Sequence, residues 1–141
     1  MPNEIRKCML RYASKQTLMG DSTERTEEVK GTWDFLKKEL KFKENIGDET
    51  QTVEVETTFV FKDEAVEVYR DGELSFNFRK DKDTQTTYNT PYGAMAMVIK
   101  TSQLAYSIDE KNGTAYLEYN IFFDPEVKSD CTYGLKFECH D

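Results

Sequence analysis

Residues 88–93 read Tyr-Asn-Thr-Pro-Tyr-Gly, and residues 94–101 read Ala-Met-Ala-Met-Val-Ile-Lys-Thr. Proline presets the backbone of a turn and glycine accepts conformations that other residues avoid, so the first segment predicts a turn. In the second segment Met95, Met97 and Ile99 recur at every second position, which is the spacing of one face of a β-strand. Together the two segments predict a turn that opens a strand through Thr101.

The same period of two extends along the chain on both sides of this turn. Its cleanest example is residues 53–61, where valine, threonine and phenylalanine alternate with polar residues. Asp71-Gly72 and Asn112-Gly113 are dipeptides typical of tight β-hairpins. Further alternating segments lie at 29–35, 104–108, 115–123 and 133–139.

We therefore predict an all-β chain that folds as one domain over residues 1–141. The spacing of the turns favours eight to ten short strands in an antiparallel meander. Because the open edges of so long a sheet invite aggregation, we expect the sheet to close into a single antiparallel up-and-down barrel.

Residues 33–43 are the one segment where a helix competes with strands. Trp33, Leu36 and Leu40 have helical spacing, and the residues between them are good helix formers. We favour a strand, a break and a second strand, because Leu40 and Phe42 resume the alternation. Residues 45–48 then read as a hairpin loop.

Composition limits the classes of function. With 19 Lys and Arg against 27 Asp and Glu, the formal net charge is −8, which argues against nucleic-acid and membrane partners. Cys8, Cys131 and Cys139 form neither a disulfide framework nor a zinc motif. The N-terminal residues lack the apolar core of a signal peptide, so we expect a reduced, cytoplasmic location.

Several motifs together resemble the YwiB-like family, a group of small bacterial proteins of unassigned function with a calycin-like (lipocalin-like) β-barrel. The motifs are residues 88–93, Ile99-Lys100-Thr101, Gly113, Tyr119-Asn120-Ile121 and the Arg70-x-Gly72 turn. The resemblance runs from about residue 70 to the C-terminus. It implies a calycin-like barrel and carries over no catalytic residue.

Gly31-Thr32-Trp33 also resembles the Gly-x-Trp of lipocalins, in which the tryptophan packs across one end of the barrel. We expect Trp33 to plug the core, and the alternative is that it forms a wall against a ligand.

No combination of reactive side chains indicates catalysis. His140 is the only histidine, and it neighbours Cys139 on a predicted strand, where adjacent side chains point to opposite faces. Neither Cys8 nor Cys131 has a recognisable base partner, and no phosphate-binding loop or nucleophile elbow occurs. We expect no enzyme activity, no metal and no cofactor.

The predicted barrel frames two hypotheses. The first is a non-catalytic module that binds a small apolar or aromatic ligand inside the barrel. The candidate lining residues are Trp33, Phe59, Phe61, Tyr88, Tyr92 and Tyr119. The alternative is a protein-interaction or scaffold module with a filled core that acts through its acidic surface, and a homodimer is left open.

Overall fold

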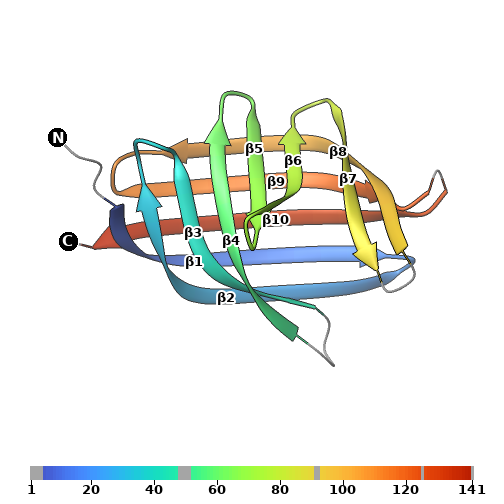
Figure 1. Ribbon diagram of the computed structural model, residues 1–141, viewed down its shortest axis with the longest axis horizontal. Coiled ribbons are helices and arrows are strands. Elements are labelled where there is room, and N and C mark those ends of the chain that lie inside the picture. Colours follow the sequence, from blue (N-terminus) through green and yellow to red (C-terminus); the bar gives the residue numbers. More distant parts are fainter. Residues whose placement is uncertain (1–4, 48–51, 91–92, 125, 141) are drawn as a thin grey trace.

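The computed structural model describes residues 5–47, 52–90, 93–124 and 126–140. Every regular element in these ranges is a β-strand (Figure 1). The strands are β1 (Ile5–Leu18), β2 (Asp21–Asp34), β3 (Glu39–Gly47), β4 (Thr52–Lys62), β5 (Ala65–Arg70), β6 (Glu73–Arg79), β7 (Asp83–Thr90), β8 (Gly93–Ile108), β9 (Asn112–Phe122) and β10 (Lys128–His140). None of the described residues belongs to a helix that could cross a membrane.

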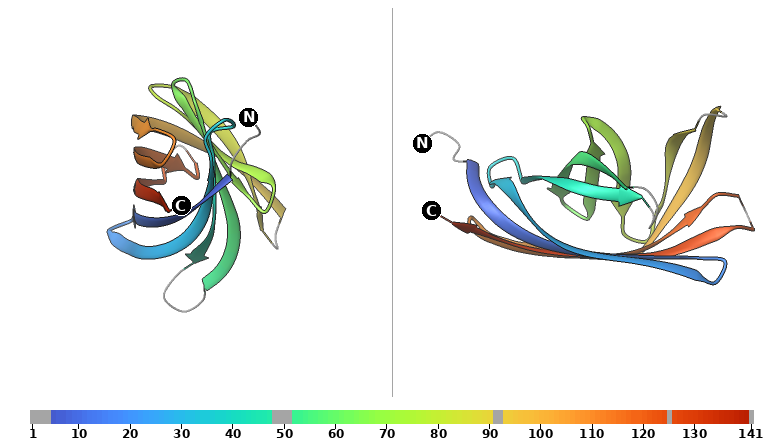
Figure 2. Two further views of the ribbon diagram at one scale, coloured as in Figure 1. Left: turned by 90° about the vertical axis from the view of Figure 1, so that its left-hand side faces the viewer. Right: turned by 90° about the horizontal axis from the view of Figure 1, so that it is seen from below.

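The strands form a single 10-stranded antiparallel sheet in the order β6-β5-β4-β3-β2-β1-β10-β9-β8-β7. Each strand pairs with its successor in the chain except β6, and the first strand pairs with the last. The two edges of the sheet are therefore the consecutive strands β6 and β7. The sheet curls until these edges approach each other, which confirms the predicted antiparallel up-and-down barrel (Figure 2).

Strands β3 to β7 cross in front of a wall made by β1, β2, β8, β9 and β10 (Figure 1). Where β6 meets β7, threonine hydroxyls bridge the two edges. Thr84 Oγ1 donates to the carbonyl oxygen of Asn77 at 2.7 Å, and Thr86 Oγ1 donates to that of Ser75 at 2.5 Å. These side chains satisfy main-chain acceptors that a regular ladder would otherwise pair.

The ambiguous segment forms a strand, a break and a strand, as predicted. β2 ends at Asp34, residues 35–38 form a turn, and β3 begins at Glu39. Lys38 adopts a φ of 58° in this turn, and its carbonyl accepts a hydrogen bond from the Phe61 N–H at 3.0 Å. This turn reverses the direction of the chain. On β3 the side chains then alternate between inward and outward positions as they do on β2.

The predicted loop at 45–48 is wrong over its first three residues. β3 continues through Gly47 because Asn45, Ile46 and Gly47 pair in register with residues of β4. Residue 48 lies outside the described part of the chain. Pairing with a partner strand outweighs the turn preference of the Asn-Ile-Gly sequence.

The two glycine dipeptides differ in role. Asp71 and Gly72 have φ values of 51° and 85°, as the central residues of a type I′ hairpin require. Gly113 instead lies within β9, where the ring of Phe137 occupies the space that a Cβ atom would need. The predicted hairpin between β8 and β9 is confirmed. Gly113, however, is required for close packing against Phe137 and not for the turn itself.

Aromatic side chains dominate the interior. The buried set is Tyr12, Trp33, Phe42, Phe59, Phe61, Phe78, Tyr133 and Phe137. Trp33 is 0% exposed, with its ring centroid 4.7 Å from that of Phe137, and its Nε1–H donates to the Asp109 carbonyl at 3.0 Å. Trp33 thus closes one end of the barrel.

Candidate functional site

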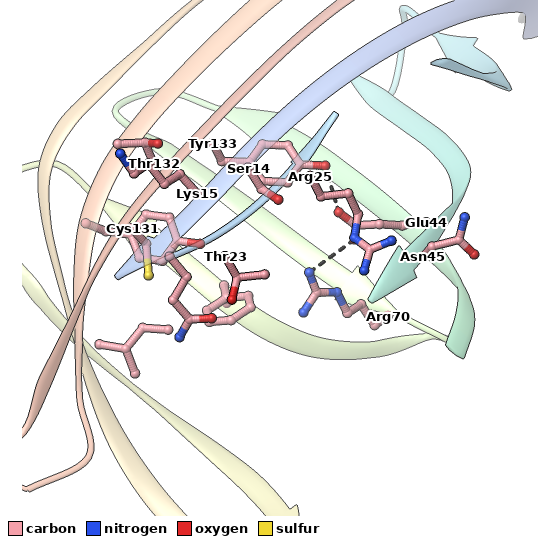
Figure 3. A pocket seen from close by; sticks show the side chains of 14 residues that line it. Ser14, Lys15, Thr23, Arg25, Glu44, Asn45, Arg70, Cys131, Thr132 and Tyr133 are labelled. Atoms are coloured by element: carbon pink, nitrogen blue, oxygen red, sulfur yellow. Dashed lines mark hydrogen bonds and ion pairs between the residues drawn. The ribbon is translucent and has the colours of Figure 1, made fainter. Parts of the chain in front are cut away.

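A cavity of about 190 Å³ lies among the residues at the other end of these strands (Figure 3). It is lined by side chains of β1, β2, β3, β5, β6, β9 and β10. One lining residue is Arg25, which lies eight residues before Trp33 on the same strand, or roughly 27 Å along it. The cavity is therefore separated from the tryptophan plug by the packed aromatic core.

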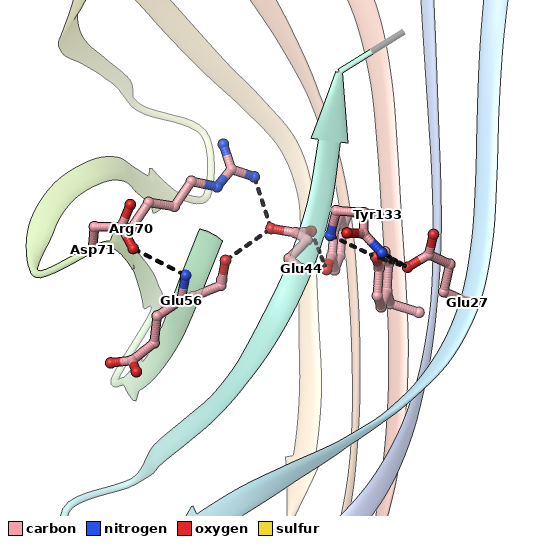
Figure 4. Close-up of polar contacts among 9 residues, drawn as sticks. Glu27, Glu44, Glu56, Arg70, Asp71 and Tyr133 are labelled. Carbon is pink, nitrogen blue, oxygen red and sulfur yellow. Dashed lines mark hydrogen bonds and ion pairs between the residues drawn. The ribbon is translucent and has the colours of Figure 1, made fainter. Parts of the chain in front are cut away.

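A buried carboxylate lies at the centre of this end. Glu44 is 2% exposed, because it occupies the inward phase that Leu40 and Phe42 begin on β3. Its Oε1 accepts from Thr57 Oγ1 at 3.0 Å and from Arg70 Nη2 at 3.1 Å. Its Oε2 accepts from the Tyr133 hydroxyl at 2.8 Å (Figure 4). A buried charge needs such partners, because burial removes its hydration.

A second carboxylate, Glu27, lies on the inward phase of β2. Its Oε2 accepts from the Tyr12 hydroxyl at 2.7 Å and from Asn45 Nδ2 at 2.9 Å, and its Oε1 accepts from Arg25 Nη1 at 3.2 Å. Partial burial acts to raise the pKa of Glu27, but these three hydrogen bonds prevail and hold it below its usual value. Glu27 is therefore ionised at neutral pH.

Two stacked tyrosines connect the carboxylates. The rings of Tyr12 and Tyr133 lie 5.8 Å apart at an interplanar angle of 1°. Burial, reinforced by the neighbouring carboxylates, raises the pKa of both hydroxyls far above the usual tyrosine value. Both tyrosines therefore stay protonated and act as hydrogen-bond donors.

Two guanidinium groups line the cavity from β2 and β5, and they lie near each other (Figure 3). Arg70 ends β5 on the inward phase of Val66 and Val68, and Arg25 lies on β2. The Arg70 guanidinium carbon lies 5.3 Å from the centre of the Phe76 ring, which forms part of the same wall. Among the described residues, Arg70 Nε is buried without a hydrogen-bond partner. Arg70 therefore has donor capacity that Glu44 does not use.

Another part of the cavity wall is less polar. Tyr119 and Ile121 of β9 line it together with Cys131 of β10. Burial raises the pKa of Tyr119, and the Cys131 thiol beside it contributes to that rise. Burial likewise raises the pKa of Cys131, so its thiol is protonated at neutral pH and is a poor nucleophile.

The structure separates the residues that the sequence singled out. Tyr119 lines the cavity, whereas Trp33, Phe59 and Phe61 are packed in the aromatic core and are 4% exposed or less. Tyr88 lies on β7, but its side chain is outside the described part of the structure, as is the whole of Tyr92.

Sequence reasoning missed the polar residues of the cavity. Glu44 could have been found, because it interrupts the apolar phase of Leu40 and Phe42 with a charge. Arg70 carried a weaker signal, since it follows Val66 and Val68 in phase but was assigned to the hairpin turn. Arg25 carried none, because its neighbours on β2 are almost all polar.

The arrangement of side chains in the cavity suits the binding of a polar group of a ligand better than the activation of such a group for a reaction. Within the ranges that the structure describes, no group of three or more His, Cys, Asp or Glu side chains could hold a metal ion. The cavity instead offers hydrogen-bond donors from Arg25 and Arg70 beside the rings of Phe76 and Tyr119.

Comparisons with known proteins agree with the fold. Residues 11–135 match the sequence profile of a family described as "Domain of unknown function (DUF1934)". The ywiB protein from Bacillus subtilis has a crystal structure similar to this one, with a TM-score of 0.78 and 14% sequence identity over 99% of this chain and 96% of that chain. Together, the profile match over most of the chain and this structural similarity confirm the expected YwiB-like family.

A second solved structure, of unknown function from Bacteroides ovatus, has a TM-score of 0.40 and 12% identity over 94% of this chain and 41% of that chain. A score this low does not establish a shared fold. No match was found among curated proteins.

Proposed function

We infer the role of this chain, which belongs to the family described as a domain of unknown function (DUF1934), from the geometry of its cavity. We propose that it is a non-catalytic module that binds a small organic anion at the end of the barrel opposite Trp33. The anionic group lies against Arg70 and Arg25, and the organic body lies against Phe76 and Tyr119.

The observation that carries this proposal is the unequal charge of the lining. Arg25 and Arg70 face the cavity with Lys15 at its border, and Glu44 is the single carboxylate among the described lining residues. Arg25 and Lys15 also pair with Glu27 and Glu24, and both of these carboxylates lie outside the lining. This concentration of cations occurs in a chain whose net charge is −8. A guanidinium presents several N–H donors in a planar fork, which suits a carboxylate or phosphate group.

The size and the apolar wall narrow the class of ligand. A cavity of about 190 Å³ is smaller than the roughly 300–1,000 Å³ of sites that hold drug-sized ligands. The ligand is therefore smaller than a drug-sized molecule. Phe76, Tyr119 and Ile121 supply apolar surface for a short aliphatic or aromatic body. The proposal therefore keeps the apolar or aromatic ligand expected from the sequence and adds an anionic group.

A thermal-shift panel tests the proposal. Small organic acids such as benzoate are compared with matched uncharged amides such as benzamide, using wild-type protein, Arg70→Gln, Arg25→Gln and the control Arg11→Gln. Arg11 has a 70% exposed side chain and pairs with Glu28 on the outer face. We expect acids to raise the Tm of the wild type and of Arg11→Gln, because a ligand that binds only the native state stabilises it.

We expect either cavity variant to weaken acid binding by about tenfold or more, since a hydrogen bond to a charged group contributes roughly 1.5–3 kcal/mol. Equal shifts with acids and amides would contradict the anion preference. Equal binding by Arg70→Gln and Arg11→Gln would contradict the site.

The alternative scaffold role has one observation in its favour, which is that aromatic side chains fill the middle of the barrel. Native mass spectrometry of freshly purified protein separates the two proposals. A bound mass that is lost on denaturation would support ligand binding. A bare mass, combined with no stabilisation by any acid, would favour a protein that acts through its surface.

A further inference from the structure

Two cysteines that are 131 positions apart in the sequence face each other on neighbouring strands. Cys8 of β1 is paired in register with Cys139 of β10. Both belong to the inward phase of their strands: Cys8 is 3% exposed, and Cys139 is partly buried against the core. They lie at the end of the barrel opposite the cavity, so the chemistry of this cysteine pair is independent of the proposed ligand.

The main-chain hydrogen bonds show which kind of pair this is. The Cys139 N–H donates to the Lys111 carbonyl at 2.7 Å, on the side of β10 that faces β9. In an antiparallel strand the N–H and C=O of one residue point to the same side, so those of Cys139 point away from β1. Cys8 and Cys139 are therefore a non-hydrogen-bonded pair, for which the Cα atoms lie about 4.5 Å apart.

This spacing is within reach of a disulfide, which joins residues with Cα atoms about 4.4–6.8 Å apart. The two side chains lie close together as well, because Cys139 helps to raise the pKa of the Cys8 thiol. Both cysteines are thiols in this structure. Cys131, the third thiol, is paired in register with Gln16 and Tyr119 and has no cysteine opposite it.

We propose that Cys8 and Cys139 form a reversible cross-strand disulfide, which makes them a redox site of this protein. Cys139 is the more exposed thiol and reacts first. Its thiolate attacks one sulfur of a disulfide oxidant such as oxidised glutathione, and one glutathione thiolate leaves. Cys8 then loses its proton and attacks the Cys139 sulfur, which releases the second glutathione. Two protein thiols are oxidised and one glutathione disulfide is reduced to two thiols.

The bond would join the first strand to the last, across the pairing that brings the two ends of the chain together. A crosslink that encloses almost the whole chain restricts the unfolded state strongly. Burial and the adjacent Cys139 raise the pKa of Cys8 to about 12, so the second step is slow at neutral pH. The oxidised form therefore accumulates slowly and is stable once formed.

Thiol counting tests the proposal. Reduced protein is incubated with oxidised glutathione, denatured in N-ethylmaleimide and weighed intact, for wild type, Cys8→Ser, Cys139→Ser and the control Cys131→Ser. Reduced wild type has three thiols to label. We expect oxidised wild type to take up a single label and oxidised Cys131→Ser to take up none. Cys8→Ser should instead retain a glutathione on Cys139.

Tryptic digestion without reduction identifies the bond, because cleavage after Lys7, Arg11 and Lys136 isolates the two cysteines in residues 8–11 and 137–141. We expect these two peptides to be linked, and the Tm of the oxidised wild type to rise by roughly 5–10 °C relative to the reduced form. Three labels on oxidised wild type, or a link that contains Cys131, would overturn the proposal.

Discussion

Tyr133 donates its hydroxyl hydrogen to Oε2 of Glu44 at 2.8 Å, and this carboxylate is 2% exposed. The same carboxylate accepts hydrogen bonds from Thr57 of β4 and Arg70 of β5. Glu44 therefore connects β3 with three other strands, one of which is far from it in the sequence. The site depends on this one buried charge for its geometry (Figure 4).

Replacing Glu44 with glutamine should lower the free energy of unfolding by about 2–3 kcal/mol. The amide nitrogen would face a buried donor, and an unsatisfied buried group costs roughly 1–3 kcal/mol. The control is Glu54→Gln, because Glu54 has a 60% exposed side chain and a loose ion pair with Lys43 at 3.8 Å. Urea unfolding of the two variants should give clearly different midpoints, and equal midpoints would contradict the role of Glu44.

Stability should fall in acid, and Glu27 should cause part of the fall. Its pKa is lowered in the folded protein, so its contribution is present above the ordinary value of 4.5 and is lost as the pH falls below that value. Glu27→Gln should therefore flatten the dependence of the unfolding free energy on pH in this range. Glu28→Gln, on the opposite face of the same strand, should keep the wild-type slope. Parallel curves for wild type and Glu27→Gln would rule out this contribution.

Gly113→Ala should destabilise the protein by about 1–3 kcal/mol, because the Phe137 ring must move to admit a methyl group. The matched control is Gly134→Ala, where the nearest heavy atom to an added Cβ is an ordinary 3.7 Å away. Thermal unfolding monitored by circular dichroism measures both. If the two variants lost equal stability, the close packing at Gly113 would not be the cause.

The seam between β6 and β7 should depend on its threonines. Thr84→Val and Thr86→Val each remove a hydroxyl that pairs with a carbonyl of β6, at a cost of about 1 kcal/mol. Amide hydrogen exchange should speed up in β6 and β7 and stay unchanged in β1 and β10. Thr87→Val, at an exposed position of β7, is the control and should leave exchange unchanged.

Much of the architecture could be predicted because it depends on local patterns. The alternation at residues 53–61 specifies β4, and Asp71-Gly72 specifies the hairpin after β5. Local patterns gave the wrong prediction at residues 45–47. This sequence favours a turn, but its pairing with β4 makes it the end of β3. It also misassigned the role of Gly113, whose constraint comes from Phe137 on another strand.

The candidate site was less predictable than the fold. Of the candidate lining residues, Tyr119 lies at the cavity, whereas Trp33, Phe59 and Phe61 are packed in the core. An alternating pattern identifies which residues point inward. It does not distinguish a filled part of the interior from a hollow one, because that depends on the side chains that other strands contribute at the same level.

The sequence by itself determined the strands, most of their turns and the faces that point inward, because a period of two and the backbone preferences of turn residues act over a few positions. Only the tertiary structure decided that β1 pairs with β10, that Glu44 meets Arg70 and Tyr133, and that Cys8 faces Cys139. These relationships depend on strand register across the whole chain. Register is set by the combined packing of all ten strands, which no local segment encodes.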